Sequence, residues 1–341
     1  MKRLALLAGL AAVGATASAQ SSVTLYGLLD LGVRYVKNGD ASVKSLSSNG
    51  NNTSRLGVRG FEDLGGPLRA GFQLESGLTP DTGAQSDPAR FWNRRSTLSL
   101  IGPGGELRRG RDYTVTYLGY ADYHVWSDIG LSSVGKFDSS LGTARDTAVR
   151  ADNQVLYLTP SLGGFYGRVG VAAGEGIVGK RHAAARAGYA AGPVDVSLTY
   201  GTTNVAPESG DDRFKTYDIG ASYDFGAAKL SGYVTQSRFA TRKVGNYYLG
   251  VQVPAGSGLV RASYLSSNLS GHTAAGLSID ADDASQLAIG YLVNLSSRTA
   301  LYANAVRVNN KGTSAIAVDK NPTLLAGKDS VGVETGMRHS F

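Results

Sequence analysis

Beyond residue 20 the chain repeats one unit, a stretch of alternating apolar and polar residues closed by a turn of Gly, Pro, Asp or Asn. In one such unit the apolar residues are Val194, Val196, Leu198 and Tyr200, and the polar residues between them are Asp195, Ser197 and Thr199. Residues 217–225 and 287–295 repeat the pattern. A period of two is typical of a β-strand whose two faces meet different surroundings. The alternation therefore predicts an all-β fold.

The turns between these units give the architecture. Short turns fall at residues 63–67, 102–105, 161–164, 191–193, 225–227, 254–258 and 295–298. Longer polar stretches lie between them. Alternating short and long connections are typical of an antiparallel up-and-down barrel. The turns divide the chain into about sixteen strands, a size at which a barrel encloses a water-filled channel.

Composition agrees with a transmembrane barrel. Mean hydropathy is −0.12, and no long apolar segment follows residue 20, as expected when only alternate residues face lipid. With 46 Gly in 341 residues and 18 Tyr against 9 Phe, the chain does not resemble a helix-rich protein. Because Cys is absent, disulfides are excluded. A soluble β-sandwich is the alternative, but many polar strand faces carry glycine or charge that a dry core would not accept.

The N-terminus has the pattern of a cleavable secretory signal. Lys2 and Arg3 precede an apolar run over residues 4–13, and small residues end at Ala19. A membrane-anchoring helix is the alternative, but the run is well short of the roughly 20 residues that a spanning helix needs. We therefore expect residues 1–19 to be a signal peptide and residues 20–341 to form one barrel domain.

The net charge is mildly basic. Without the two basic residues of the signal, 34 − 2 = 32 Lys and Arg stand against 27 Asp and Glu, a net of +5. Such a balance fits nucleic acid, an anionic membrane surface or an anionic solute. Export argues against nucleic acid as a partner.

No motif predicts bond chemistry. The histidines lack an accompanying serine or acid motif; they are His124, His182, His272 and His339. The cluster Asp280, Asp282 and Asp283 lacks the spacing and closing glutamate of a dedicated calcium site. The sequence thus predicts no enzyme, no cofactor and no metal centre.

Several segments resemble the trimeric general porins of Gram-negative bacteria, of the neisserial and β-proteobacterial type. Residues 22–30 (SVTLYGLLD) resemble the opening strand, and residues 54–65 (SRLGVRGFEDLG) the second strand and first turn. Residues 105–112 (GELRRGRD) are similar to the strand before the constriction loop, and residues 336–341 (GMRHSF) to the closing strand. Arg109 stands where the family usually has an apolar residue.

The resemblance implies an outer-membrane channel for passive diffusion of small ions and hydrophilic solutes. It also implies a homotrimer in contact with outer-membrane lipid and lipopolysaccharide. Phe341 and its neighbours would be the signal read by the assembly machinery. The closing strand has one apolar face, with Val333 and Met337, and a polar face with Glu334; we expect it to pair with residues 23–36.

Residues 113–150 exceed the roughly 12 to 15 residues beyond which an unstructured loop is unusual. By resemblance this is the third loop, folded into the lumen, although it lacks the Pro-Glu-Phe-Gly-Gly type sequence of many members. Its acidic candidates for the pore are Asp122, Asp128 and Asp138.

The resemblance also assigns a basic wall opposite this loop. Its arginines are Arg55, Arg59, Arg94, Arg95, Arg111 and Arg150, with Asp30 and Glu75 as acidic candidates on the wall. Fixed positive charge at a narrow point lowers the barrier for anions, so a weak anion preference is expected. Alternatively, several of these arginines merely neutralise wall carboxylates. An acidic loop facing an arginine wall would also set a transverse field across the pore.

A substrate-specific porin for small organic anions is the closest alternative function. Such channels combine arginines with aromatic stacking residues, and the predicted loop contains Tyr117, Tyr120, Tyr123 and Trp126. An adhesin or structural anchor would need a passenger or a peptidoglycan-binding domain, and we find neither in the sequence.

Overall fold

A computed structural model describes residues 22–137, 141–143 and 145–341. The expected signal peptide and Asp138 lie outside the described residues. The first strands are β1 (Ser22–Asn38), β2 (Ala41–Ser48), β3 (Arg55–Gly65), β4 (Leu68–Thr79), β5 (Ala84–Gln85), β6 (Arg95–Gly102), β7 (Gly105–Tyr113), β8 (Arg150–Leu158) and β9 (Phe165–Ala172). The others are β10 (His182–Ala191), β11 (Val194–Glu208), β12 (Asp211–Asp224), β13 (Lys229–Phe239), β14 (Arg242–Ala255), β15 (Gly258–Ser270), β16 (Ala284–Asn294), β17 (Thr299–Asn310) and β18 (Ser330–Ser340).

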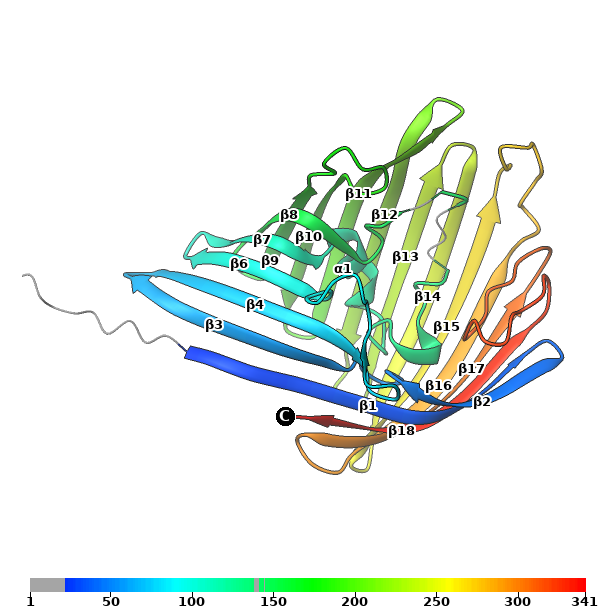
Figure 1. Ribbon diagram of the computed structural model, residues 1–341, viewed down its shortest axis with the longest axis horizontal. Helices are drawn as coiled ribbons and strands as arrows, with labels where there is room; N and C mark the ends of the chain where they lie inside the picture. The colour runs from blue at the N-terminus through cyan, green and yellow to red at the C-terminus, as the bar shows by residue number, and fades with distance from the viewer. Residues whose placement is uncertain (1–21, 138–140, 144) are drawn as a thin grey trace, which may run out of the picture.

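The strands form one antiparallel sheet that closes on itself (Figure 1). Of the 18 strands described, β5 is a two-residue element in a loop, and β2 and β3 together line the other side of β1. The barrel wall therefore has 18 − 2 = 16 strands, as the turn pattern predicts. The α-helix α1 (Val115–Ala121) and the 3-10 helix η1 (Gly130–Ser132) lie between β7 and β8. Neither described helix has the length and apolar character to cross a bilayer.

The barrel closes where the sequence predicts. β18 pairs with β1 from Leu28 opposite Ser340 to Asn38 opposite Ser330. Phe341 continues the pairing, because it exchanges backbone hydrogen bonds with Gly27. The Phe341 ring lies against Gly27, where a Cβ would come within 2.3 Å of the ring and displace it. Closure satisfies the backbone groups that two free edges would expose to lipid.

The outer surface of the wall is apolar, and its inner surface is polar. Leu198, Ile219 and Ile289 are 57%, 55% and 56% exposed on the outside, whereas the alternate residues Thr199 and Asp218 are buried inside. An apolar belt of this extent is stable in lipid but not in water. Tyrosines lie along the belt, as at Tyr200 beside Tyr217, where the ring centroids are 4.8 Å apart.

The connections follow the predicted alternation only in part. All the short turns named above join strands at one end of the barrel. At the other end, the connections at residues 39–40, 209–210 and 240–241 are also short, contrary to the expectation of longer stretches there. The reason is that their flanking strands run on beyond the rest of the wall: β11, for example, has 15 residues.

The predicted third loop folds into the barrel (Figure 1). α1 contacts the inner faces of β9 to β13, and η1 contacts β17 and β18. Thr114 starts the helix by accepting a hydrogen bond from the Tyr117 amide. The described part of the loop thus covers one side of the inner wall, including Leu156 of β8, and leaves the face formed by β3, β4, β6 and β7 uncovered.

Candidate pore constriction

The uncovered wall carries a cluster centred on Glu75 of β4. Arg94 Nε donates to Glu75 Oε1 at 2.6 Å, and Arg55 Nε lies 3.8 Å from Oε2. Tyr26 Oη donates to the same Oε2 at 3.0 Å and accepts from Gln73 Nε2 at 2.6 Å. Adjacent strands bring Tyr26, Arg55 and Glu75 together because each lies on the inward side of the alternation, and Arg94, just before β6, is joined to β4 by the bond from its backbone N–H to the Glu75 carbonyl.

A second cluster continues along the same wall and is centred on Asp112. Arg95 Nη2 lies 2.7 Å from Asp112 Oδ1, and Arg108 Nη1 lies 2.6 Å from Oδ2. Arg108 Nε also contacts Glu106 Oε1 at 2.8 Å. Gln73 links the two clusters, because its Oε1 accepts from Arg95 Nη1 at 2.5 Å.

Arg59 and Arg150 of the wall contact aromatic rings, and neither forms an ion pair among the described residues. The Arg150 guanidinium lies 4.1 Å from the centroid of the Tyr113 ring, and its Nε donates to the Arg94 carbonyl at 2.9 Å. The Arg59 guanidinium lies 5.4 Å from the Tyr26 ring. Within the described part of the chain, no carboxylate forms an ion pair with either residue. Their charge therefore remains available to the lumen.

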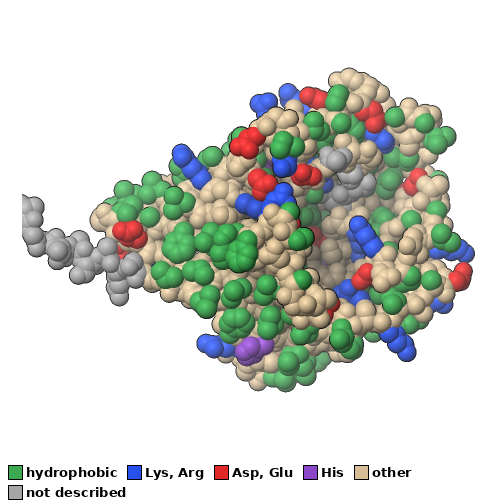
Figure 2. Space-filling view, viewed as in Figure 1, with side chains coloured by type: hydrophobic (Ala, Val, Ile, Leu, Met, Phe, Trp, Pro, Cys, Tyr) green, Lys and Arg blue, Asp and Glu red, His purple; other side chains and the backbone are tan. Residues whose placement is uncertain are grey.

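The wall as a whole is positive. Its cations are Arg55, Arg59, Arg94, Arg95, Arg108 and Arg150, and its anions are Glu75, Glu106 and Asp112, which gives 6 − 3 = +3 among described residues. A cavity of about 430 Å³ lies in front of it, lined among others by Tyr26, Arg55, Glu75, Arg94, Arg95 and Tyr113. Figure 2 shows the molecule hollowed at its wide end, with basic and acidic side chains around the hollow.

The facing side of the lumen is the third loop, held by buried hydrogen bonds. Trp126 Nε1 donates to Asn304 Oδ1 of β17 at 3.1 Å, and Gln286 Nε2 of β16 donates to the Ser132 carbonyl at 2.8 Å. Tyr123 Oη contacts Ser197 Oγ of β11 at 2.9 Å. These bonds connect the loop to strands on both sides of the covered wall.

Burial also sets the ionisation state of the histidine in this loop. Burial, with help from nearby positive charge, lowers the pKa of His124 to about 3. The neutral imidazole then accepts, at Nδ1, the amide N–H groups of Trp126 at 3.2 Å and Asp128 at 3.0 Å. His124 thus shapes the loop and does no chemistry.

The two acidic loop candidates that the structure describes, Asp122 and Asp128, do not form the expected charged face. Asp122 Oδ2 lies 2.5 Å from Arg186 Nη1 of β10 and 3.6 Å from Arg168 Nη1 of β9. Asp128 turns back into its own loop, where Oδ1 accepts from Ser133 Oγ and from two backbone amides. Asp122 and Asp128 therefore do not support the acidic half of the predicted transverse field, because wall arginines pair with one carboxylate and loop amides enclose the other.

The prediction that Asp30 faces the pore is wrong. Its side chain is fully buried, and its carboxylate accepts the backbone N–H groups of Gly50, Asn51 and Asn52. Tyr302 Oη donates to it at 2.6 Å. Asp30 therefore stabilises the break between β2 and β3, where backbone amides would otherwise lack partners.

Arg111 lies apart from the Glu75 cluster. It lies opposite Ser96 in β6, so alternation places it on the other side of β7 from Asp112. Its Nη1 lies 2.6 Å from Asp152 Oδ1. A cavity of about 220 Å³ at this outer end is lined by Arg90, Arg111, Asp146, Thr147, Arg150, Ala151, Asp152 and Lys180. Arg111 thus belongs to the outer end of the wall and not to the Glu75 cluster.

The sequence reasoning missed several inward arginines, among them Arg108 and Arg186. Because Arg109 stands where an apolar residue is usual, the sequence did not give the register of this strand. Arg108 was therefore missed, although it has the same parity as Asp112. The structure gives the register: Arg109 lies opposite Leu98 and Val155, on the apolar outer face. The alternation along β10 predicts that Arg186 points inward, but the sequence does not show that it forms an ion pair with Asp122.

Asp280, Asp282 and Asp283 each accept a hydrogen bond from a backbone amide, and the three amides belong to different segments. Asp280 accepts from the Gly271 amide at 2.8 Å, Asp282 from the Thr313 amide at 2.6 Å, and Asp283 from the Leu269 amide at 3.2 Å. Among the described residues, no group of three or more His, Cys, Asp or Glu side chains is arranged to hold a metal ion.

Comparisons with known proteins agree with this geometry. The profile of the family described as Gram-negative porin matches residues 5–313. The chain is 39% identical to outer membrane porin protein 32 of Delftia acidovorans, over 100% of this chain and 99% of that protein. The solved anion-selective porin from Comamonas acidovorans superposes with a TM-score of 0.84 at 35% identity, over 94% of this chain and 100% of that chain. The trimer form of OmpT from Vibrio cholerae shares the fold, with a TM-score of 0.66 at 15% identity, over 94% of this chain and 99% of that chain. A closed barrel with an apolar belt, an inserted third loop and these relatives lead to one conclusion: the chain belongs to the Gram-negative porin family and is an outer-membrane porin, not an enzyme.

Proposed function

We propose that this porin is a general diffusion channel with a weak preference for anions, set by the basic wall. The observation that carries the proposal is the excess of six arginines over three carboxylates, with Arg59 and Arg150 free of acidic partners among the described residues. The solved relative at 35% identity is titled an anion-selective porin. That likeness supports the same preference here.

Selectivity follows from fixed charge and needs no bound solute. An anion that passes between the wall and the third loop exchanges part of its hydration for guanidinium N–H groups, whereas a cation is repelled. Arg55, Arg95 and Arg150 keep partly exposed side chains, so they act on the solute directly. Arg94 is 8% exposed and bonded to Glu75, so it mainly positions that carboxylate.

The substrate-specific alternative is less favoured. The four loop aromatics that suggested it do not reach the lumen surface, because Tyr117, Tyr120, Tyr123 and Trp126 are at most 8% exposed. They pack between the loop and the covered wall, where no solute can stack on them. A general channel therefore fits these residues better.

We further infer that the chain assembles as a homotrimer, since porins of this family are typically trimers. Arg109 supports this inference from the chain itself. It points outward from β7 between Leu98 and Val155, which are 65% and 43% exposed. An arginine facing lipid near the midplane of a barrel costs about 2–4 kcal/mol. A neighbouring subunit that covers this strand would remove that cost.

Export and assembly complete the proposal. Residues 1–19 would be removed after Ala19, and the closing strand with Phe341 would be recognised by the outer-membrane assembly machinery. The Phe341 ring lies over Gly27 next to the seam of the barrel, so it is also part of closure. Outer-membrane lipid and lipopolysaccharide would surround the apolar belt.

Reversal potentials across a potassium chloride gradient in planar bilayers test the selectivity. We expect anion preference in the native protein and a reduced preference in Arg150→Gln. Arg307→Gln is the control, because Arg307 lies on the outward face, paired with Asp329 at 2.8 Å. Cation preference in the native channel, or equal effects of both substitutions, would overturn the proposal.

A further inference from the structure

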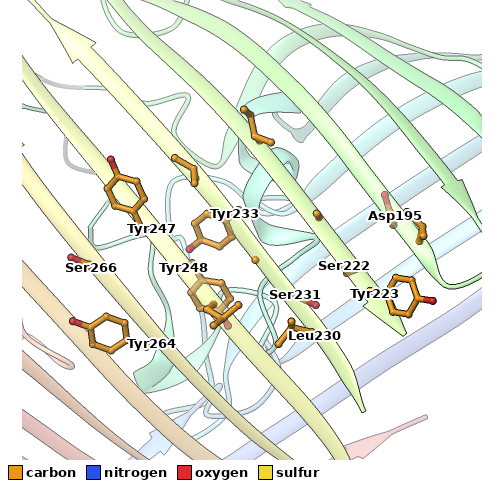
Figure 3. A pocket seen from close by; sticks show the side chains of 16 residues that line it. Asp195, Ser222, Tyr223, Leu230, Ser231, Tyr233, Tyr247, Tyr248, Tyr264 and Ser266 are labelled. Atoms are coloured by element: carbon orange, nitrogen blue, oxygen red, sulfur yellow. The ribbon is translucent and has the colours of Figure 1, made fainter. Parts of the chain in front are cut away.

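Two cavities away from the constriction differ in their lining. The larger, of about 640 Å³, lies on the outward surface of β11 to β15, where Tyr223, Tyr247 and Tyr264 border it (Figure 3). These rings are exposed members of the apolar belt, so this cavity suits hydrocarbon. The smaller cavity, of about 220 Å³, is the one at the outer end of the uncovered wall, and most of its lining is charged. We call it the outer cavity; its charged residues are Arg90, Arg111, Asp146, Arg150, Asp152 and Lys180.

Three outer connections and two strand ends meet at the outer cavity. Arg90 lies in the connection between β5 and β6, and Lys180 lies in the connection between β9 and β10. Asp146 lies near the end of the third loop. Arg111 and Arg150 belong to β7 and β8, close to the ends of these strands. Residues far apart in the sequence are thus brought to one place at the outer mouth.

Two of the four cations of the outer cavity already have acidic partners. Arg90 Nη1 lies 3.2 Å from Asp87 Oδ2, and Arg111 Nη1 lies 2.6 Å from Asp152 Oδ1. The other two cations are Lys180 and Arg150, and neither forms an ion pair among the described residues. An ammonium and a guanidinium therefore remain for the oxygens of an anionic solute, which accept charge-assisted hydrogen bonds from both groups.

Asp146 makes the outer cavity selective among anions. Within the described part of the chain, this carboxylate has no ion pair either. It repels sulfate, which has no proton to donate. Hydrogenphosphate, a dianion of similar size, has a P–OH group that donates a hydrogen bond to a carboxylate while its other oxygens accept from cations. Two cations and one carboxylate therefore suit hydrogenphosphate better than sulfate or chloride.

The size and position of the outer cavity suit this solute as well. A volume of about 220 Å³ has room for several water molecules, so hydrogenphosphate fits with part of its hydration shell. The Arg150 guanidinium lies 4.1 Å from the Tyr113 ring centroid, and Tyr113 also lines the cavity of about 430 Å³ in front of the Glu75 cluster. An anion that leaves the outer cavity past Arg150 thus arrives at the constriction.

We propose that the outer cavity captures hydrogenphosphate, with Lys180 and Arg150 binding its oxygens and Asp146 accepting the hydrogen bond of its P–OH group. The site raises the local concentration of phosphate beside the constriction, as a cluster of fixed charge does for an ion of opposite sign. The inference deepens the proposed function and rests on it, because captured phosphate must still pass an anion-preferring constriction.

Isothermal titration calorimetry of the purified porin in detergent, with sodium phosphate and with sodium sulfate at mildly alkaline pH, tests the role of Asp146. The native protein should bind hydrogenphosphate roughly tenfold more tightly than sulfate, because one hydrogen bond is gained and one repulsion is avoided. Asp146→Asn should remove this difference, since an amide does not repel sulfate. Equal affinities in the native protein, or an unchanged difference in Asp146→Asn, would overturn the proposal.

The cationic half is tested by Lys180→Gln, which should weaken the binding of both anions roughly threefold to fivefold. Lys320→Gln is the matched control, because it removes the same charge from an exposed position in the connection between β17 and β18, outside the lining of the outer cavity. Its phosphate affinity should equal that of the native protein. Equal losses in the two variants would show that general positive charge, and not this cavity, attracts phosphate.

Reversal potentials in potassium chloride distinguish failure of the outer cavity from failure of the proposed function. A native channel with anion preference but equal affinities for the two anions would overturn the capture site alone. A native channel without anion preference, whose phosphate binding still depends on Asp146 and Lys180, would overturn the proposed selectivity and leave the cavity as a phosphate site.

Discussion

The two halves of the inner wall differ, although one period-two pattern builds both. On β3, β4, β6 and β7 the inward side chains form the Glu75 and Asp112 clusters beside the lumen. On β10 to β18 the inward side chains meet the third loop and form a dry core with Trp126, Leu131 and Phe137. Alternation decides which residues point inward, but the loop decides whether the inside is wet.

Packing and charge are therefore divided between the two halves of the wall. The loop-covered half holds the loop in place by burying large side chains, and the bare half keeps its arginines in contact with the lumen. Four substitutions or conditions test this division, from the largest expected effect to the smallest.

The largest effect is expected in the covered half. Trp126→Ala removes a ring that is 2% exposed and should lower the free energy of unfolding by about 3–5 kcal/mol. Heat modifiability on gels and thermal unfolding followed by circular dichroism measure the change. Trp92→Ala is the matched control, because Trp92 lies in the outer loop between β5 and β6 and is only partly buried. Similar losses in both variants would show that the loop core does not hold the channel together.

A smaller loss of stability is expected from the paired arginine of the bare half. Arg94→Gln removes the 2.6 Å bond to Glu75 and should cost about 1.5–3 kcal/mol, the range for hydrogen bonds to charged groups. Arg55→Gln, whose contact with Glu75 is 3.8 Å, should cost less than about 1 kcal/mol. The same unfolding measurement compares them, and a reversed order would contradict the assignment of Arg94 as a positioning residue.

Selectivity should depend on the unpaired arginine. Arg150→Gln removes a charge that no carboxylate offsets among the described residues and should lower the anion-to-cation permeability ratio roughly twofold to fivefold, as about 0.5–1 kcal/mol of lost attraction implies. Its stability should change little. Arg94→Gln could instead shift the permeability ratio more than Arg150→Gln while the Glu75 cluster stays folded. That result would contradict the assignment of selectivity to the unpaired Arg150.

The smallest effect concerns salt. At about 0.1 M the screening length is about 10 Å, and at about 1 M it is about 3 Å. Anion preference should therefore fall as salt rises while conductance increases in proportion. Reversal potentials at a fixed concentration ratio measure this. A preference independent of salt would indicate a solute-binding site, which a block of current by a small organic anion would then reveal.

The sequence predicted much of the fold because the signals involved are local. The short turns and the alternating residues lie within a few positions of one another, and the pairing of the closing strand with residues 23–36 follows from the need to close the barrel. The third loop was predicted from its length and by resemblance. Three outer connections, at residues 39–40, 209–210 and 240–241, were not foreseen as tight, since nothing local shows how far the flanking strands extend.

The candidate site was predicted less completely, because contacts between distant residues decide it. The sequence identified Arg94 and Glu75 but not their 2.6 Å contact, and it placed Asp30 in the pore when backbone amides enclose it. Arg111 was assigned to the constriction although its parity places it on the other side of β7. A strand register fixes such parity, and here it is disturbed by the irregular pairing of β7 with β8.

By itself, then, the sequence determined the period-two strands, their apolar outer side and the closed topology, because backbone hydrogen bonding in lipid allows few other solutions. The tertiary structure alone decided which arginines are neutralised, which loop aromatics are buried, and that Asp146, Arg150 and Lys180 line one cavity. Charges act on one another over a few ångströms of space, and positions many residues apart in the chain come that close only through strand pairing and loop insertion.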